Sequence, residues 1–353
     1  MKLKDELMNA LLQEIELRKD FLPNDHLESI YFGGGTPSLL NREELERTFS
    51  VISKYFSWDN HSEITIETNP DDLTETYLSD LRNTPINRLS IGIQSFFEED
   101  LKFMNRAHNA AQAERCIPLA QDKGFENITA DLIYGSPTTS DYQLKSNLDK
   151  MIRFEVPHIS AYCLTVEEGT ALSHFVKKNL VPNVDERKAM NQFDIVIETL
   201  VDNGFTQYEI SNFARENFRA IHNSNYWKGK PYLGIGPGAH SFDGNNIRSW
   251  NISHNPKYFK GIQGGNLPLE EEHLTIEDLY NEYVLTSLRT VWGISDLKIE
   301  KDYPEYYNQF KESIRPFIDS NHIQKSDDIY TLTTEGKHIA DKISMELFTL
   351  KND

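Results

Sequence analysis

The stretch SIYFGGGTPS, residues 29 to 38, joins a short apolar run to three consecutive glycines and a proline. Glycines carry no side chain, so the backbone can approach a ligand closely there. The loop is neither a G-x-G-x-x-G fingerprint nor a P-loop, because no lysine follows it and Pro37 lacks an amide donor. We expect the amides of Gly33 to Gly35 and the Thr36 hydroxyl to hold a small amine or carboxylate. A tight structural turn is the alternative.

Outward from this loop, short runs of β-forming residues alternate with polar, helix-like segments over two-thirds of the chain. The predicted strands are Ser29–Phe32, Glu63–Thr68, Arg88–Gln94, Ile128–Gly135, His158–Thr165 and, more weakly, Thr206–Phe213. Such alternation predicts an α/β fold with a parallel sheet and helices packed outside it. Five or six units favour a barrel or partial barrel, and a flat doubly wound sheet is the alternative.

Polar residues stand near the ends of these predicted strands: Glu67, Asn69, Gln94, Asp131 and Thr165. Ligand sites of parallel α/β folds lie at the carboxyl ends of the strands, so we expect these side chains to converge on one mouth. The alternative is that each strand end is polar only because it meets water.

Composition limits the classes of partner. The net charge of −19 would repel nucleic acid, so we expect no nucleic-acid partner. No apolar run approaches 18 residues, which predicts no integral membrane segment and leaves peripheral membrane contact open. The first 22 residues predict an amphipathic helix rather than a signal peptide. Two cysteines indicate no disulfide framework and a reducing, cytoplasmic location.

The last third follows a different pattern. Asn, Gly and Pro are dense between Asn245 and Pro268, which predicts a loop. After Leu274 come helical patterns, a predicted hairpin around Ser326 to Asp328, and a final helix, which together predict a winged-helix-like module. From Glu277 to Leu350 the sequence has 14 acids and 8 bases, so DNA binding is the weaker interpretation of that module.

Five motifs occur in a characteristic order: GGGTPS, IETNP, IGIQSF, MNRAH and DLIYGSP. Together they resemble the radical S-adenosylmethionine (radical SAM) proteins of the oxygen-independent coproporphyrinogen oxidase group, over nearly the whole chain. The resemblance implies a partial (β/α) barrel of the radical SAM type, missing its first strand, in residues 1–181. It further implies barrel completion with a heme-binding segment in 182–268, and a C-terminal helical module in 269–353.

The same resemblance implies an S-adenosylmethionine site. Gly34, Gly35 and Thr36 match the loop that holds the methionine end of the ligand. Glu67 matches the residue that binds the ribose hydroxyls, a role that suits its two acceptor oxygens. The residues that complete the implied pocket are Gln94, Arg106 and Asp131.

HNSNYW, residues 222 to 227, matches the HNxxYW pattern of the HemW branch, the heme chaperones, and GIGPGAHSF also fits that branch. His222 is the expected axial ligand of heme iron, and Tyr226 and Trp227 offer flat apolar area for a porphyrin. A surface loop whose histidine caps or packs is the alternative. Three basic residues nearby are expected to meet propionates: Arg219, Lys228 and Lys230.

The sequence departs from the family at one place. The family carries a CxxxCxxC loop after its first strand, whose three thiolates hold a [4Fe–4S] cluster. Here Cys116 and Cys163 have no partners at that spacing, and we expect both to be buried. An incomplete chain and a cluster-less paralogue are the two explanations. We expect incompleteness, because the downstream pocket residues are all present.

Three functions follow as hypotheses. The first is a heme chaperone of the HemW type, which binds heme at His222 and passes it to an acceptor hemoprotein. The second is an oxygen-independent coproporphyrinogen III oxidase, a radical SAM enzyme of heme biosynthesis. The missing cysteines argue against it for this chain, so enzymatic activity is left open. The third is a remnant that binds neither heme nor S-adenosylmethionine.

Overall fold

The computed structural model describes residues 2–178 and 180–349. They form two compact units, each made of several chain segments. The first, called the sheet unit, comprises residues 29–42, 63–178 and 180–220; the second, called the helical unit, comprises residues 2–28, 43–62 and 221–349. These packing units do not test the functional boundaries expected after residues 181 and 268, which stay predictions.

The sheet unit holds a seven-stranded sheet in the order β1-β2-β3-β4-β5-β7-β6, in which β1 to β5 are parallel. The strands are β1 Ser29–Phe32, β2 Glu63–Thr68, β3 Arg88–Gln94, β4 Asn127–Tyr134, β5 His158–Cys163, β6 Thr206–Gln207 and β7 Asn212–Ala214. The helices are η1 Pro37–Leu39, α3 Glu75–Leu81, α4 Glu98–Phe103, α5 Ala110–Asp122, α6 Asp141–Arg153, α7 Ala171–Lys177 and α8 Glu186–Asp202. The α/β prediction is confirmed, and this sheet is an open one.

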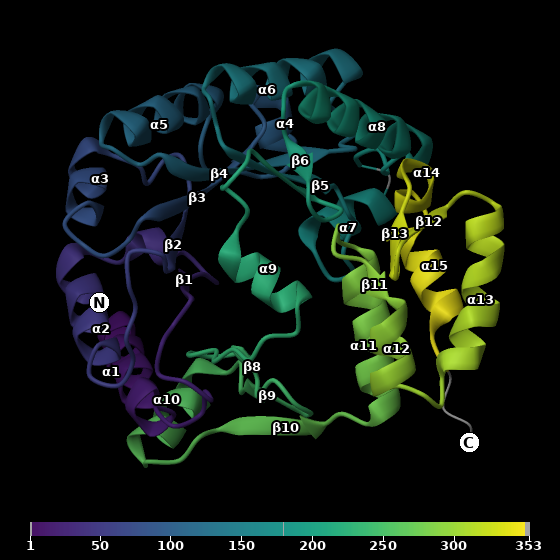
Figure 1. Cartoon of the computed structure of the whole chain (residues 1–353). Coiled ribbons are helices and arrows are strands. Elements are labelled where there is room, and N and C mark those ends of the chain that lie inside the picture. Colours follow the sequence, from purple (N-terminus) through teal and green to yellow (C-terminus); the bar gives the residue numbers. More distant parts are fainter. Residues whose placement is uncertain (1, 179, 350–353) are drawn as a thin grey trace. The chain divides into compact units, whose positions relative to one another are not determined.

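Helices α3, α5, α6 and α8 lie along the outer side of the sheet (Figure 1). Their starts follow capping rules, because a side chain at each N-cap accepts a hydrogen bond from a backbone amide of the first turn. Thr74 caps α3, Asn109 and Ser140 begin capping boxes on α5 and α6, and Asp185 caps α8. The middle strands β2 to β4 are buried along most of their length, as expected for a parallel sheet.

A chain of buried polar groups crosses the sheet near the beginnings of its strands. Arg88, 2% exposed, donates to Glu63 at 2.6 Å and also to Thr129. Thr129 meets Nδ1 of His158 at 3.1 Å, and Nε2 of His158 meets the Tyr208 hydroxyl at 2.8 Å. Each charge and ring nitrogen thus has a partner, as buried polar groups require. This polar chain does not reach the carboxyl ends of the strands, where the sequence predicts a ligand site.

The predicted sixth strand is wrong as a single element. The segment from Thr206 to Phe213 turns back on itself, so that β6 pairs antiparallel with β7, and β7 pairs antiparallel with β5. Gln207 closes the turn by donating to the Ile210 carbonyl, and Glu209 accepts from the Ser211 amide. These local side-chain bonds compete with a continuous ladder, which the residue pattern alone does not reveal.

The helical unit contains two further three-stranded sheets, in the orders β10-β9-β8 and β11-β13-β12. Its strands are β8 His240–Phe242, β9 Ile247–Asn251, β10 Leu269–His273, β11 Ile294–Ser295, β12 Ile323–Ser326 and β13 Ile329–Leu332. Its helices are α1 Lys2–Leu17, α2 Arg42–Ile52, α9 Ile221–Trp227, α10 Asn255–Gln263, α11 Ile276–Leu288, α12 Asp296–Asp302, α13 Tyr307–Asp319, α14 Thr334–Lys337 and α15 Ala340–Leu347.

The C-terminal part has the winged-helix order, in which α11, β11, α12 and α13 precede a hairpin of β12 and β13. The predicted hairpin is confirmed, with Asp327 at a positive φ of 55° in its turn. The loop predicted between Asn245 and Pro268 is wrong, because this stretch contains β9 and α10. Pro256 stands at the start of α10 behind the N-cap residue His254, a position where proline favours a helix.

A buried carboxylate joins three segments of the helical unit. Glu14 of α1 is 0% exposed and accepts from the Gly236 amide at 2.8 Å, Nδ2 of Asn251 at 2.6 Å and the Tyr258 hydroxyl at 2.5 Å. Arg18 lies 3.7 Å from the same carboxylate and supplies the positive charge. Glu14 thereby fixes α1 against β9, α10 and the glycine-rich turn before β8. Burial is the main cause of the raised pKa of the Tyr258 hydroxyl, and the Glu14 charge adds to it.

We expect Glu14→Ala to destabilise the helical unit by about 3–5 kcal/mol, because the change leaves the Arg18 charge and three donors without their acceptor. Urea unfolding followed by tryptophan fluorescence measures this, since all four tryptophans belong to that unit: Trp58, Trp227, Trp250 and Trp292. Glu16→Ala, an exposed residue of the same helix, is the control, with an expected change below about 1 kcal/mol. Equal midpoints for the two variants would contradict the role given to Glu14.

Candidate functional site

The glycine loop after β1 presents open backbone. Gly34 and Gly35 have φ values of +71° and +67°, which side chains rarely allow, and no atom would meet a Cβ built on either within 4 Å. Thr36 precedes η1, but its side chain makes no capping bond with that helix. The backbone around Gly34 and Gly35 is therefore uncrowded, and a ligand site at this loop stays a prediction.

Glu67, near the end of β2, faces this loop. Its Oε2 accepts from the Gly34 amide at 3.2 Å, and its Oε1 accepts from the Tyr31 hydroxyl at 2.9 Å. Burial, followed by the nearby Glu67 charge, raises the pKa of Tyr31, so the phenol stays protonated and donates. The motif reasoning missed Tyr31, which looks in sequence like one more residue of an apolar strand.

Gln94, Arg106 and Asn69 converge beside Gly92. A Cβ on Gly92 would lie 3.1 Å from Nη2 of Arg106 and 3.1 Å from Nε2 of Gln94, so a side chain there would require both groups to shift by a few tenths of an ångström. Arg106 donates to Oδ1 of Asn69 at 3.2 Å. Gln94 has a φ of 65°, an uncommon value for a residue with a side chain, and such strain often marks functional sites.

Asp131 lies inside the sheet unit on β4. Burial raises its pKa to about 7; a hydrogen bond with Ser160 opposes the rise, and the Glu67 carboxylate adds to it. Ser160 also donates to Oδ1 of Asn212 at 2.7 Å, and Asn212 in turn donates to the buried Glu209. These hydrogen bonds thus connect Asp131 on β4 to polar residues of β5 and β7. The sequence does not reveal this connection, because the segment from Thr206 to Phe213 has the residue pattern of a single strand.

The HNSNYW hexapeptide forms most of helix α9, in the helical unit. His222 and Tyr226 are four residues apart and therefore share a face of the helix. Nε2 of His222 lies 3.2 Å from the Tyr226 hydroxyl, and their rings meet edge to face at 5.0 Å. Tyr226 then packs edge to face on Tyr232 at 4.6 Å, and Tyr232 lies 6.4 Å from the ring of Phe242. The histidine stands at the end of an aromatic row.

The basic residues near α9 already contact other side chains of the protein. Lys230 donates to both oxygens of Glu28, at 2.7 Å and 2.6 Å, and Asn225 donates to the same carboxylate at 3.2 Å. Lys228 lies over the Trp292 ring at 4.4 Å. Arg219, in the sheet unit, lies over the Tyr208 ring at 6.0 Å. Each predicted propionate partner is thus already engaged by a group of this protein.

Trp227 carries an unmet polar group. Its indole Nε1 is buried and has no hydrogen-bond partner among the described residues, an arrangement that is usually costly. The guanidinium of Arg289 lies 5.9 Å from the centre of its ring. Trp227 therefore offers a flat apolar surface and an indole NH that could donate a hydrogen bond to a ligand.

The cysteines do not fit an iron–sulfur cluster. Cys116 is buried inside α5, where burial raises the pKa of its thiol to about 12. Cys163 is exposed at the end of β5, so the expectation that both would be buried is wrong for it; the last position of a strand meets solvent. Among residues 2–178 and 180–349, no three His, Cys, Asp or Glu side chains are grouped to hold a metal ion.

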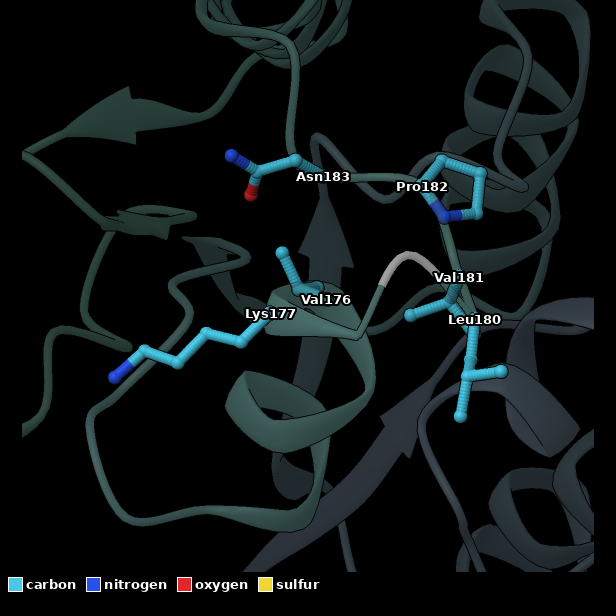
Figure 2. A pocket seen from close by; sticks show the side chains of 6 residues that line it. All are labelled: Val176, Lys177, Leu180, Val181, Pro182 and Asn183. Carbon is cyan, nitrogen blue, oxygen red and sulfur yellow. The ribbon is translucent and has the colours of Figure 1, made fainter.

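A hollow lies at the end of α7 (Figure 2). Its lining residues are Val176, Lys177, Leu180, Val181, Pro182 and Asn183. None of them is a predicted site residue, and apolar side chains make up most of the lining. Lys177 and Asn183 are labelled at separate places around it in Figure 2, and we assign no ligand to the hollow.

Residues 8–151 match the family model of the radical SAM superfamily. The heme chaperone HemW of Mycobacterium tuberculosis is 33% identical over 291 residues, which cover 82% of this chain and 74% of the relative. The heme chaperone HemW of Bacillus subtilis is 30% identical over 344 residues, which cover 96% and 90%. This chain belongs to the HemW family of radical SAM proteins. The family match confirms the resemblance read from the five motifs and the HNSNYW hexapeptide.

A solved structure of the radical SAM enzyme coproporphyrinogen III oxidase (HemN) from Escherichia coli superposes with a TM-score of 0.82 at 22% identity, covering 98% of this chain and 83% of that one. At this identity the likeness shows the fold. In the described parts of the chain, no helix has the length and hydropathy to cross a membrane.

We expect Asp131→Asn to stabilise the protein at pH 8. The folded carboxyl keeps its proton up to about pH 7, whereas the unfolded one loses it near pH 4. The raised pKa therefore contributes stability below pH 4 that is lost as the pH rises to 7. The variant should melt roughly 2–5 °C higher at pH 8, with a smaller gain at pH 5. Asp149→Asn, an exposed change on α6, should show no such pH dependence. A gain independent of pH would contradict the raised pKa.

Proposed function

We propose that this protein is a heme chaperone, which binds heme at His222 and passes it to an acceptor hemoprotein. The observation that carries the proposal is α9, where a half-exposed imidazole, a tyrosine and a tryptophan occur within six residues, next to further aromatic rings. Neutral imidazole binds heme iron through a ring nitrogen, and aromatic faces suit a porphyrin. The names of the relatives support the same function.

The cargo site would use the partners described above. Nε2 of His222 would exchange the Tyr226 hydroxyl for iron, and the unpaired indole NH of Trp227 is a suitable donor to a propionate. Lys228 lies over the Trp292 ring, whereas Lys230 forms an ion pair with Glu28, so we expect Lys228 rather than Lys230 to meet a second propionate. Heme would therefore bind to His222, Trp227 and Lys228 in place of the contacts that these residues make in the unliganded protein.

We further propose that the loop from Gly33 to Thr36, with Glu67, Gln94, Arg106 and Asp131, is the S-adenosylmethionine site of the sheet unit. The open glycines, the acceptor pair of Glu67 and the charge of Arg106 suit a ligand with an amine, a carboxylate and a ribose diol. The family uses this ligand together with a [4Fe–4S] cluster. The two cysteines of this sequence do not supply three thiolates, so we assign no oxidase chemistry to these residues.

The proposed setting is the cytoplasm, with two thiols unpaired as in a reducing compartment. Heme and an acceptor hemoprotein are the proposed partners. Nucleic acid is not among them, because the net charge of −19 opposes binding to a polyanion. Heme transfer to an added apo-hemoprotein, followed by the change in Soret absorbance, measures the delivery step separately from binding.

His222→Ala should weaken hemin binding roughly tenfold or more, because an iron–nitrogen bond is lost while the aromatic surface remains. Titration followed by Soret absorbance and tryptophan quenching measures the affinity. His61→Ala, an exposed histidine of the same unit, is the matched control and should bind like the wild-type protein. Unchanged affinity in His222→Ala would sink the assignment of that residue. The absence of any saturable hemin binding would favour the remnant hypothesis.

Tyr226→Phe should tighten hemin binding a few-fold. The change keeps the ring against Tyr232 but removes the hydroxyl that competes with iron for Nε2 of His222. The same titration measures it, with Tyr55→Phe, a half-buried tyrosine of the same unit, as the control. Weaker binding in Tyr226→Phe would show instead that the hydroxyl contacts heme.

A further inference from the structure

Tyr31 and Glu67 lie on one face of the sheet because of strand register. Tyr31 of β1 pairs with Thr65 of β2, so Glu67 is two residues further along and points to the same side. Diagonal neighbours at this spacing are within reach of long side chains. The 2.9 Å bond between the Tyr31 hydroxyl and Oε1 of Glu67 is therefore a product of the ladder itself.

Gly33 makes this contact possible. A Cβ at Gly33 would lie 2.6 Å and 2.9 Å from two ring carbons of Tyr31 and 3.0 Å from Oε1 of Glu67. Real Cβ atoms essentially never show the first two distances, and the third is tighter than most real Cβ contacts, so any side chain at Gly33 would require the Tyr31 ring to shift. The first glycine of the loop thus seats the Tyr31 ring, whereas Gly34 and Gly35 face open space.

Both oxygens of Glu67 are consequently engaged by the protein itself. Tyr31 donates to one oxygen and the Gly34 amide donates to the other. A ligand with two adjacent hydroxyls would direct two donors at the same two oxygens. The amide can rotate only with its loop, but the tyrosine is 37% exposed and can swing away into solvent.

We propose that Tyr31 is an internal substitute for the ribose diol, which a nucleoside ligand must displace from Glu67. This inference rests on the proposed S-adenosylmethionine site and adds the residue that sets its affinity. The apparent affinity for an adenosyl group is the difference between what Glu67 gains from ribose and what it loses from Tyr31. Tyr31 stabilises the unliganded pocket and lowers its affinity for the ligand.

The test compares ligands with and without the diol on two variants. Tyr31→Phe keeps the ring on Gly33 and removes the competing donor, so adenosine and S-adenosylmethionine should bind roughly tenfold more tightly by calorimetry, the effect of one hydrogen bond to a charged group. 2′,3′-Dideoxyadenosine, which lacks both hydroxyls, should show no gain. Glu67→Gln should weaken adenosine binding and cancel the gain when combined with Tyr31→Phe.

Tyr142→Phe, a tyrosine 78% exposed on α6, is the control for loss of a hydroxyl and should change nothing. Equal or weaker adenosine binding in Tyr31→Phe overturns the inference while leaving the site intact, provided that binding still depends on Glu67. An equal gain for the dideoxy compound also overturns it. Binding that ignores Glu67, or no binding to any variant, overturns the S-adenosylmethionine site as well. The hemin titrations are independent of all these outcomes.

Discussion

Parallel pairing of β1 to β5 is the constraint on which the candidate site in the sheet unit depends. Parallel strands bring all their carboxyl ends to one side, so residues separated by many positions in sequence meet there. The buried bond of Arg88 with Glu63 and the contact of His158 with Tyr208 hold the opposite side together. These buried bonds tie the beginnings of neighbouring strands together, and the register of β1 and β2 brings Glu67 to the glycine loop.

Much of this arrangement could be predicted from the sequence. The first three strands have the predicted bounds, since runs such as EITIET carry a strong β signal between polar segments. The hairpin of β6 and β7 could not be predicted, because side chains such as Gln207 and Glu209 form its turn through bonds that depend on three-dimensional contacts. Helix α10 could not be predicted from the sequence for a different reason. A proline such as Pro256 suggests a loop, unless it is known to stand at the start of a helix.

The site shows the same division. Glycines, Glu67 and His222 are visible in motifs, because chemistry demands those residue types. Tyr31 is not, because its role follows from register and from the space above Gly33, neither of which is written in the local sequence. Lys230 looks like a free cation in sequence, and only the structure shows that Glu28, 202 residues away, holds it.

The two proposed sites share one physical feature. In each, a tyrosine hydroxyl meets the atom that the ligand would use: Tyr31 meets Glu67, and Tyr226 meets His222. A polar group partly shielded from water costs free energy if it has no partner, so a pocket for a tight ligand destabilises the empty protein. A tyrosine removes that cost and lowers the ligand affinity by a similar amount. For the proposed heme chaperone this exchange would be useful, because a heme displaced by an internal group leaves no unsatisfied atom behind.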